Sequence, residues 1–158
     1  PVAEDVSAAD IIDDFDSKHI SKFWEWSIFE KPGFKMKSGN LNLEAGNRAP
    51  FLGVKTSVPD YHCVSLYERN RSSASGGLGL IGDENNYVAL LASKDSLLVV
   101  RAREGKKEIL KKIATPSRKY IRLKMTVRNG KDIVFSYSGD IDGLQFQTID
   151  INGLSAAG

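Results

Sequence analysis

Residues 121–128 read Ile-Arg-Leu-Lys-Met-Thr-Val-Arg, a stretch in which apolar and polar side chains alternate strictly. Successive side chains of a β-strand point to opposite faces, so this stretch predicts a strand with one buried and one solvated face. The pair Asn129-Gly130 follows, and it is typical of a tight hairpin turn, whose two central residues need positive φ. Ile133 and two aromatic residues continue the alternation beyond the turn. The residues expected to point into a core are Ile121, Leu123, Met125, Val127, Phe135 and Tyr137.

Short apolar runs separated by turn residues continue outward from this hairpin. Pairs such as Ser38-Gly39 and Glu104-Gly105 mark the turns. Residues 108–113 could form a helix, but Gly105 and Pro116 leave room for barely two turns. About eleven short strands without a long helix predict an all-β sandwich or barrel. The expected strands are 34–37, 40–44, 51–56, 61–68, 76–81, 87–92, 96–102, 108–113, 120–128, 132–138 and 144–151.

The composition is that of one globular domain. A chain of 158 residues fits a single domain, and 41% hydrophobic with 27% charged residues are ordinary values for a packed core. Disordered chains have fewer apolar residues and a larger net charge. Residues 1–12 are small and acidic, and we expect a linker or loose segment there, followed by a single β-sandwich domain from 13 to 158.

Charge and hydropathy exclude several classes of partner. The 22 Lys and Arg residues exceed the 20 Asp and Glu residues by two and are scattered, so nucleic acid is not an expected partner. No apolar run approaches the roughly 20 residues that span a bilayer, so a membrane is not expected either. Cys63 is the only cysteine, which excludes an internal disulfide, and its apolar neighbours indicate a small hydrophobic residue in a strand.

Three motifs follow one another between residues 13 and 151. The first comprises Phe15-Asp16, Trp24-Glu25-Trp26-Ser27 and Lys31-Pro32-Gly33-Phe34; the second is residues 76–90; the third is residues 135–140, closing on Phe146. In this order they resemble the lectin-like sandwich that follows the catalytic domain in family 43 glycoside hydrolases. The sequence departs from that family where Phe146 stands in place of a tryptophan and where Ile141-Asp142 are inserted.

The resemblance implies a two-sheet antiparallel jelly-roll sandwich of the concanavalin-like kind, in a secreted (extracellular or periplasmic) protein. It also implies a non-catalytic carbohydrate-associated module, which either binds a polysaccharide or oligosaccharide or supports an adjacent glycoside hydrolase catalytic domain. The alternative is a laminin-G-like structural or protein-interaction sandwich that binds no sugar.

Catalysis is not expected of this chain. Retaining glycosidases need two carboxylates about 5–5.5 Å apart, and a Glu-x-Asp-x-x-Glu strand that would supply them is absent. Asp83-Glu84 lies in a turn signal, where adjacent side chains point apart. His19 and His62 have no nucleophile signature nearby, and no metal-ligand spacing occurs. A glycosidase with an unfamiliar carboxylate pair is a third, weaker reading.

A sugar site is expected where aromatic rings and rigid hydrogen-bond donors share a surface. Tyr61 and Tyr67 alternate with Val64 and Leu66 and so face away from that apolar pair. If the strands 61–71 and 96–103 are neighbours, their tyrosines and arginines form one surface, suited to uronic acids or hydroxyl-rich sugars. An ordinary solvated sheet face is the alternative, and at least one tryptophan is expected in the core. The candidate carbohydrate-binding residues are Tyr61, Tyr67, Arg69, Asn86, Tyr87, Arg101, Trp24 and Trp26.

The acidic group Asp10, Asp13, Asp14 and Asp16 has two readings. It could be a solvated turn, or it could supply oxygen ligands to a structural Ca²⁺ together with Asp150 of the last strand, because chain termini often lie close together. The candidate metal ligands are Asp14, Asp16 and Asp150.

Overall fold

The computed structural model describes residues 11–17, 19–25, 33–44, 51–56, 58–69, 75–115, 118–139 and 145–151. The chain divides into two compact units, residues 1–58 and 59–158. The sequence predicts a linker at 1–12 and one domain from 13 to 158. Residues 1–10 lie outside the described part, so that boundary stays a prediction.

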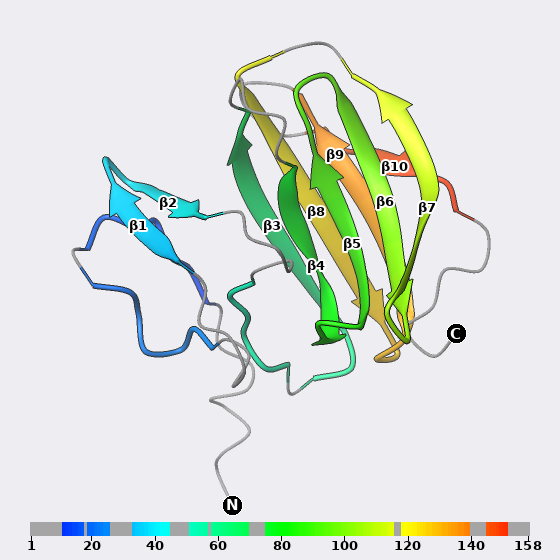
Figure 1. Cartoon of the computed structure of the whole chain (residues 1–158), viewed down its shortest axis with the longest axis horizontal. Helices are drawn as coiled ribbons and strands as arrows, with labels where there is room; N and C mark the ends of the chain where they lie inside the picture. The colour runs from blue at the N-terminus through cyan, green and yellow to red at the C-terminus, as the bar shows by residue number, and fades with distance from the viewer. Residues whose placement is uncertain are drawn as a thin grey trace, which may run out of the picture. The chain divides into compact units, whose positions relative to one another are not determined.

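The described residues of the second unit form two sheets of four strands each, and every strand pairing among them is antiparallel. One sheet, called here the β8 sheet, has the order β10-β9-β8-β3, and the other, the β5 sheet, has the order β4-β5-β6-β7. Figure 1 shows the β5 sheet lying over the β8 sheet. The strands are β3 (Tyr61–Glu68), β4 (Gly76–Asp83), β5 (Asn86–Ala92), β6 (Ser96–Arg103), β7 (Lys106–Ala114), β8 (Tyr120–Arg128), β9 (Asp132–Ser138) and β10 (Gln147–Ile149).

The predicted all-β, two-sheet antiparallel sandwich is therefore confirmed. The part of the chain that the structure describes contains no helix, and so none that is long and apolar enough to cross a membrane.

The core lies between the two sheets and contains the residues that strand alternation selected. Ile121, Leu123, Met125 and Val127 of β8 are at most 4% exposed, and Phe135 of β9 is 1% exposed. Tyr137 is half-buried and packs against the same cluster. The β5 sheet contributes Val88, Leu90, Ala92, Leu97 and Val99 from the facing side. Burial of side chains from both layers is what holds two amphipathic sheets together.

Three turns share one backbone feature, a positive φ at two consecutive residues of which the second is glycine. Asn129 and Gly130 have φ of 55° and 70°, as predicted for the β8–β9 turn, and the Lys131 amide donates to the Arg128 carbonyl. Ser38-Gly39 and Glu104-Gly105 also have positive φ at both positions. These turns match the right-handed twist of the strands that they join, which is why glycine occupies the second position.

Two glycines bring β4 close to β5. A methyl group on Gly77 would lie 1.9 Å from the Leu90 carbonyl oxygen, and one on Gly79 would lie 2.4 Å from the Val88 carbonyl oxygen. Both obstacles are backbone atoms of the neighbouring strand, which cannot turn aside as a flexible side chain can. The observed spacing of β4 and β5 therefore requires glycine at these positions.

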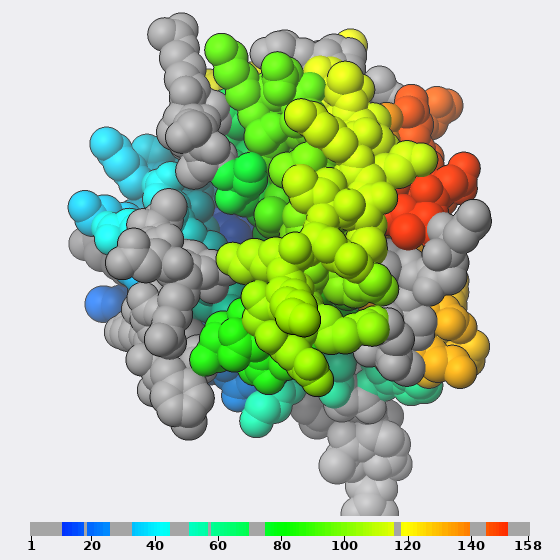
Figure 2. Space-filling view, turned by 45° about the vertical axis from the view of Figure 1, so that its right-hand side comes forward, coloured from blue at the N-terminus to red at the C-terminus, as the bar shows by residue number. Residues whose placement is uncertain are grey.

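The β5 sheet ends, among the described strands, at β7, which carries Lys106, Lys107, Lys111 and Lys112. Lysines along a terminal strand oppose pairing with a further strand, because a partner would have to bury or displace their charges. Figure 2 shows the side chains of β7 standing out from the surface of this side of the second unit.

In the first unit β1 (Phe34–Lys37) and β2 (Asn40–Leu43) form a hairpin. The prediction of a strand at 51–56 is wrong. Of these residues only Gly53 pairs with another segment, in an isolated bridge with Glu25. The apolar run at 51–56 is thus not part of a strand ladder, and one pair of backbone hydrogen bonds joins Gly53 to Glu25. Within the described ranges of the chain, ten strands form instead of about eleven.

Candidate functional site

The outer face of the β8 sheet is defined by the register of its strands. Directly opposed residues of antiparallel strands share a face, so the neighbours of the buried β8 residues point inward and the alternate residues point outward. The outward rows are Leu66–Arg122–Ser138, Val64–Lys124–Ser136 and Glu68–Tyr120. Leu66 and Val64 are 56% and 48% exposed, and Tyr120 is 45% exposed. This face therefore presents large apolar side chains to solvent beside cationic ones.

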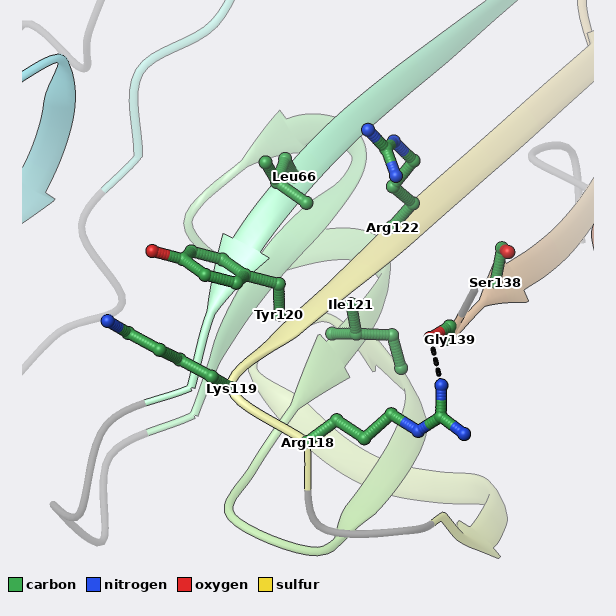
Figure 3. Close-up of a pocket in the computed structure, with 8 residues that line it drawn as sticks. All are labelled: Leu66, Arg118, Lys119, Tyr120, Ile121, Arg122, Ser138 and Gly139. Atoms are coloured by element: carbon green, nitrogen blue, oxygen red, sulfur yellow. Dashed lines mark hydrogen bonds between the residues drawn. The ribbon is translucent and has the colours of Figure 1, made fainter. Parts of the chain in front are cut away.

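A shallow depression of about 420 Å³ lies at one end of this face, where β3 and β9 end and β8 begins. It is open to solvent. Figure 3 shows Leu66, Tyr120 and Arg122 beside one another on β3 and β8, with Arg118 reaching across toward β9. The lining residues are Leu66, Arg118, Lys119, Tyr120, Ile121, Arg122, Ser138 and Gly139.

Polar contacts hold the cations of the depression in place. The Arg118 Nη1 donates to the Gly139 carbonyl oxygen at 2.8 Å. The Lys119 ammonium lies 3.7 Å from the Glu68 carboxylate and 5.3 Å from the centre of the Tyr120 ring. Tyr120, and after it Glu68, raises the pKa of Lys119. Next along the face, the Lys124 ammonium lies 5.2 Å from the centre of the Phe146 ring.

Tyr61 and Tyr67, two of the predicted sugar-binding residues, lie on the inner side of β3. They pair with Val127 and Ile121, and both pack against the hydrophobic core. Burial raises the pKa of Tyr67, against smaller opposing effects of the Gly76 backbone and Arg69. Val64 and Leu66 were predicted to be the buried side of this strand, and that prediction is wrong. A tyrosine ring is mostly apolar and can fill a core while its hydroxyl stays near the sheet edge.

Arg69 follows β3 and is only 9% exposed. Its Nη2 donates to Thr115 Oγ1 at 2.5 Å, and its backbone N–H donates to the Lys119 carbonyl at 2.7 Å. Burial lowers the pKa of Arg69, while the charges of Asp95 and Tyr67 oppose that shift. The described contacts make Arg69 a connection between loops rather than a surface donor.

The other predicted residues belong to the β5 sheet. Arg101 shares the core-facing side with Val88 and forms an ion pair with Glu108 of β7. Tyr87 lies on the opposite side of the sheet and is half-buried. The Asn86 amide donates to Asp83, and its oxygen accepts from the Glu104 N–H at 3.0 Å, so Asn86 ties two turns together.

The single surface predicted from the strands 61–71 and 96–103 is therefore not formed. β3 belongs to the β8 sheet and β6 to the β5 sheet, so the two strands are not neighbours. Their tyrosines and arginines point into the core, into local ion pairs, or to different faces. Arg71 lies outside the described residues.

Trp24 lies in the first unit and is half-buried. Its ring is stacked 6.0 Å from that of Phe15, and its Nε1 donates to Asp13 Oδ2 at 2.7 Å. Burial raises the pKa of Asp13, but hydrogen bonds from Trp24, Phe15 and Ser21 outweigh burial and lower it overall. Trp26 lies outside the described residues.

The predicted calcium ligands do not form a complete set in the described part of the chain. Asp14 Oδ1 accepts from the Asp16 N–H at 3.3 Å, a local turn contact. No three His, Cys, Asp or Glu side chains come together there closely enough to hold a metal ion. Calcium takes six to eight oxygen ligands, so Asp14 and Asp16 alone do not fit it. Asp10 lies outside the described residues, and Asp150 belongs to the second unit.

Calcium binding by Asp14, Asp16 and Asp150 thus stays a prediction, and thermal unfolding tests it. An ion that binds only the folded state raises stability by mass action, so chelator should lower the midpoint of the wild type and leave that of Asp16→Ala unchanged. A wild-type midpoint that does not respond to chelator would show that the acidic group is a solvated turn.

The residues that line the depression were missed, although the sequence carried a signal for them. Tyr120, Arg122 and Lys124 are the outward half of the alternation that identified β8 as an amphipathic strand. A strand with an aromatic and two cations at consecutive outward positions differs from an ordinary solvated face. Those positions indicate the outward face of β8, whereas the depression itself also needs Leu66 of β3 and Gly139 after β9.

Comparison with known proteins bears on the fold. No model of a protein family matches the sequence, and neither does any curated protein. Among solved structures, the GH43 protein BlXynB (K247S mutant) from Bacillus licheniformis matches with a TM-score of 0.69 and 18% identity. The two share a fold. The resemblance drawn from the three sequence motifs is thereby confirmed at the level of fold. The match covers 91% of this chain but only 30% of that protein, so this chain spans less than a third of its length.

Proposed function

We propose that this chain is a non-catalytic carbohydrate-associated module that binds glycan on the outer face of the β8 sheet. The observation that carries the proposal is the exposed Tyr120 ring beside exposed Leu66, next to Arg118 and Arg122 in an open depression. Sugars present C–H faces that pack on aromatic rings, and their hydroxyls need fixed polar partners. Tyr120 and Leu66 offer the apolar contact, and the arginines offer the donors.

The shape of the depression favours one stretch of a longer chain over an enclosed small molecule. It is open to solvent, and Lys124 lies farther along β8 in contact with Phe146. Such a site buries only one side of each sugar, and the hydroxyls give up water as they bind, so the affinity should be modest.

The shared fold supports the assignment to a glycan-degrading system. A protein described as GH43 contains this fold as part of a chain more than three times longer than the matched segment. The proposal therefore includes a polysaccharide or oligosaccharide as the ligand, a secreted location, and an adjacent catalytic domain in the parent protein.

Binding rather than turnover is proposed on two observations, one on the lining of the depression and one on Asp83 of the other sheet. Glycoside hydrolysis generally uses a pair of carboxyl groups, and the described lining of the depression includes none. The Asp83 carboxylate accepts hydrogen bonds from the Asn85 N–H and the Asn86 amide. These bonds lower the pKa of Asp83 and keep the carboxylate in the β4–β5 turn.

A structural role is the second candidate, and the exposed aliphatic residues favour it. Val64, Leu66 and Val134 on the outer face of the β8 sheet are each more than 40% exposed. Adjacent apolar side chains on a surface can mark a contact with another protein domain. In that role the face would support a neighbouring domain, and no sugar would bind.

Affinity electrophoresis against a panel of plant polysaccharides tests the proposal. We expect at least one polysaccharide to retard the wild type without being shortened. Tyr120→Ala should weaken that interaction about tenfold through loss of the stacking ring, while Tyr120→Phe should retain most of it. Ile109→Ala is the matched control, because Ile109 is an exposed apolar residue on β7 of the other sheet.

Two results would count against the proposal. No retardation by any polysaccharide would leave the structural role as the better account. Equal losses in Tyr120→Ala and Ile109→Ala would place the contact elsewhere on the molecule.

A further inference from the structure

We infer that Asn129-Gly130 is a modification site, where spontaneous deamidation produces isoaspartate at a rate controlled by the contact of this turn with Pro59 and Asp60. A glycine after asparagine has no side chain to shield its backbone nitrogen, so this pair favours the reaction. The inference is independent of the proposed glycan site. The depression lies at the Tyr120 end of β8, and this turn follows the other end of the strand.

The reaction needs only these two residues and water. The Gly130 nitrogen bonds to the side-chain carbonyl carbon of Asn129 and gives up its proton, and the side-chain nitrogen leaves with that proton as ammonia. Water then opens the resulting five-membered succinimide ring at either of its two carbonyl groups. One opening gives aspartate, and the other gives isoaspartate, in which the main chain runs through the former side chain. No oxidant or reductant is required, because no electrons are exchanged with another molecule.

Burial does not protect this turn from the reaction. Asn129 and Gly130 are both exposed, and a methyl group added to Gly130 would meet nothing within 4 Å apart from its chain neighbours. Water therefore has access to the turn. Protection in the folded chain has to come instead from contacts that restrain the Gly130 nitrogen and the backbone beside it.

Hydrogen bonds restrain the nitrogen that has to attack. The Gly130 N–H donates to the Pro59 carbonyl oxygen at 2.7 Å, and the Asn129 N–H donates to Asp60 Oδ1 at 2.8 Å. Attack requires the Gly130 nitrogen to lose the proton that it donates, so its bond to Pro59 has to break first. The intact contact therefore slows deamidation, and the reaction proceeds in the fraction of molecules whose turn has opened.

The contact joins segments that are far apart in the sequence. Pro59 and Asp60 come directly before β3, whereas the turn joins β8 to β9, and 69 positions separate Asp60 from Asn129. A local opening at the start of β3 is enough to free the turn, and the rest of the sheet can stay folded. Deamidation of Asn129 then records that opening as amide exchange does, but with a permanent product.

Isoaspartate acts against closure of the turn. It adds a carbon atom to the main chain between two strands whose register is set by a two-residue turn. Val127 and Ile133 pair beside this turn and are 0% and 5% exposed, so a change of register here reaches the core. Modified molecules therefore stay open for more of the time, and they accumulate as the protein ages.

Peptide mapping by mass spectrometry after timed incubation of the full chain tests the inference, with an isoaspartyl methyltransferase assay to identify the product. We expect Asn129 to deamidate at least about tenfold more slowly in the folded chain than in guanidinium chloride, because only the open fraction reacts. Asp60→Ala should raise the rate in the folded chain about fivefold, through loss of a hydrogen bond to a charged acceptor, and leave the rate in denaturant unchanged. Asp60→Asn keeps an acceptor and should stay near the wild type. The second Asn-Gly pair of the chain, Asn152-Gly153, gives the intrinsic rate in denaturant from the same maps.

Asp83→Ala is the matched control, because Asp83 is also a carboxylate that accepts a turn N–H, that of Asn85 in the other sheet. It should leave the rate at Asn129 unchanged, and equal acceleration by both variants would overturn the role of Asp60. Equal rates in the folded and denatured wild type would overturn control by the fold. So would a folded Asp60→Ala variant that deamidates at the wild-type rate. If Asp60→Ala does not fold, hydrogen exchange of the wild-type Gly130 amide decides, since exchange as fast as in denaturant would overturn the protecting contact.

Discussion

Replacing Leu123 by alanine is expected to lower the free energy of unfolding by about 2–5 kcal/mol. Leu123 lies in the middle of β8, is 0% exposed, and belongs to the cluster between the two sheets. Alanine removes buried methyl groups and leaves a cavity that close-packed neighbours fill only in part. Urea denaturation of the wild type and the variant, followed by circular dichroism, measures the difference.

Leu66→Ala is the matched control for this experiment. Leu66 is a leucine in the same sheet, but it points outward and is 56% exposed. Its truncation should change the free energy of unfolding by less than about 0.5 kcal/mol. If Leu66→Ala were as destabilising as Leu123→Ala, the inward and outward sides of the β8 sheet would have been assigned in reverse.

Replacing Gly77 by alanine is expected to cost about 2 kcal/mol or more, although only one methyl group is added. That methyl would lie 1.9 Å from the Leu90 carbonyl oxygen, so β4 has to move away from β5 and weaken the ladder between them. The same denaturation measurement applies, and amide exchange of β5 should speed up in the variant.

Gly139→Ala is the control for the glycine substitution. The nearest atom to an added methyl there is Arg118 Cδ at 4.0 Å, which is an ordinary contact. This variant should be within about 0.5 kcal/mol of the wild type, or slightly more stable through the reduced entropy of the unfolded chain. A Gly77→Ala variant as stable as Gly139→Ala would mean that β4 and β5 lie farther apart than described here.

Local patterns predicted the sandwich well because they act within one strand or one turn. The alternation of residues 121–128 identified the buried side of β8, since every second residue there is apolar and the others are polar. Asn129-Gly130 identified the turn because few other pairs accept positive φ at both positions. Neither inference depends on which strand lies next to which.

The candidate site depended on information that one strand does not contain. β3 has tyrosines on one side and Val64 and Leu66 on the other, so both sides are apolar and hydropathy does not choose between them. The register with β8 decides, and that pairing joins residues about 60 positions apart in the chain. The separation of β3 and β6 into different sheets is equally non-local. The predicted tyrosine and arginine surface failed for this reason.

The lysine-rich strand β7 has a consequence for the way this sandwich can be used in larger proteins. A module tethered to other domains, or crowded on an insoluble polymer, meets copies of itself at high local concentration. A terminal strand without charged side chains would then pair with the terminal strand of another copy and start polymerisation. The four ammonium groups of β7 instead repel an identical strand. Neutralising these lysines by acetylation would therefore remove a safeguard against aggregation while leaving the fold of each copy intact.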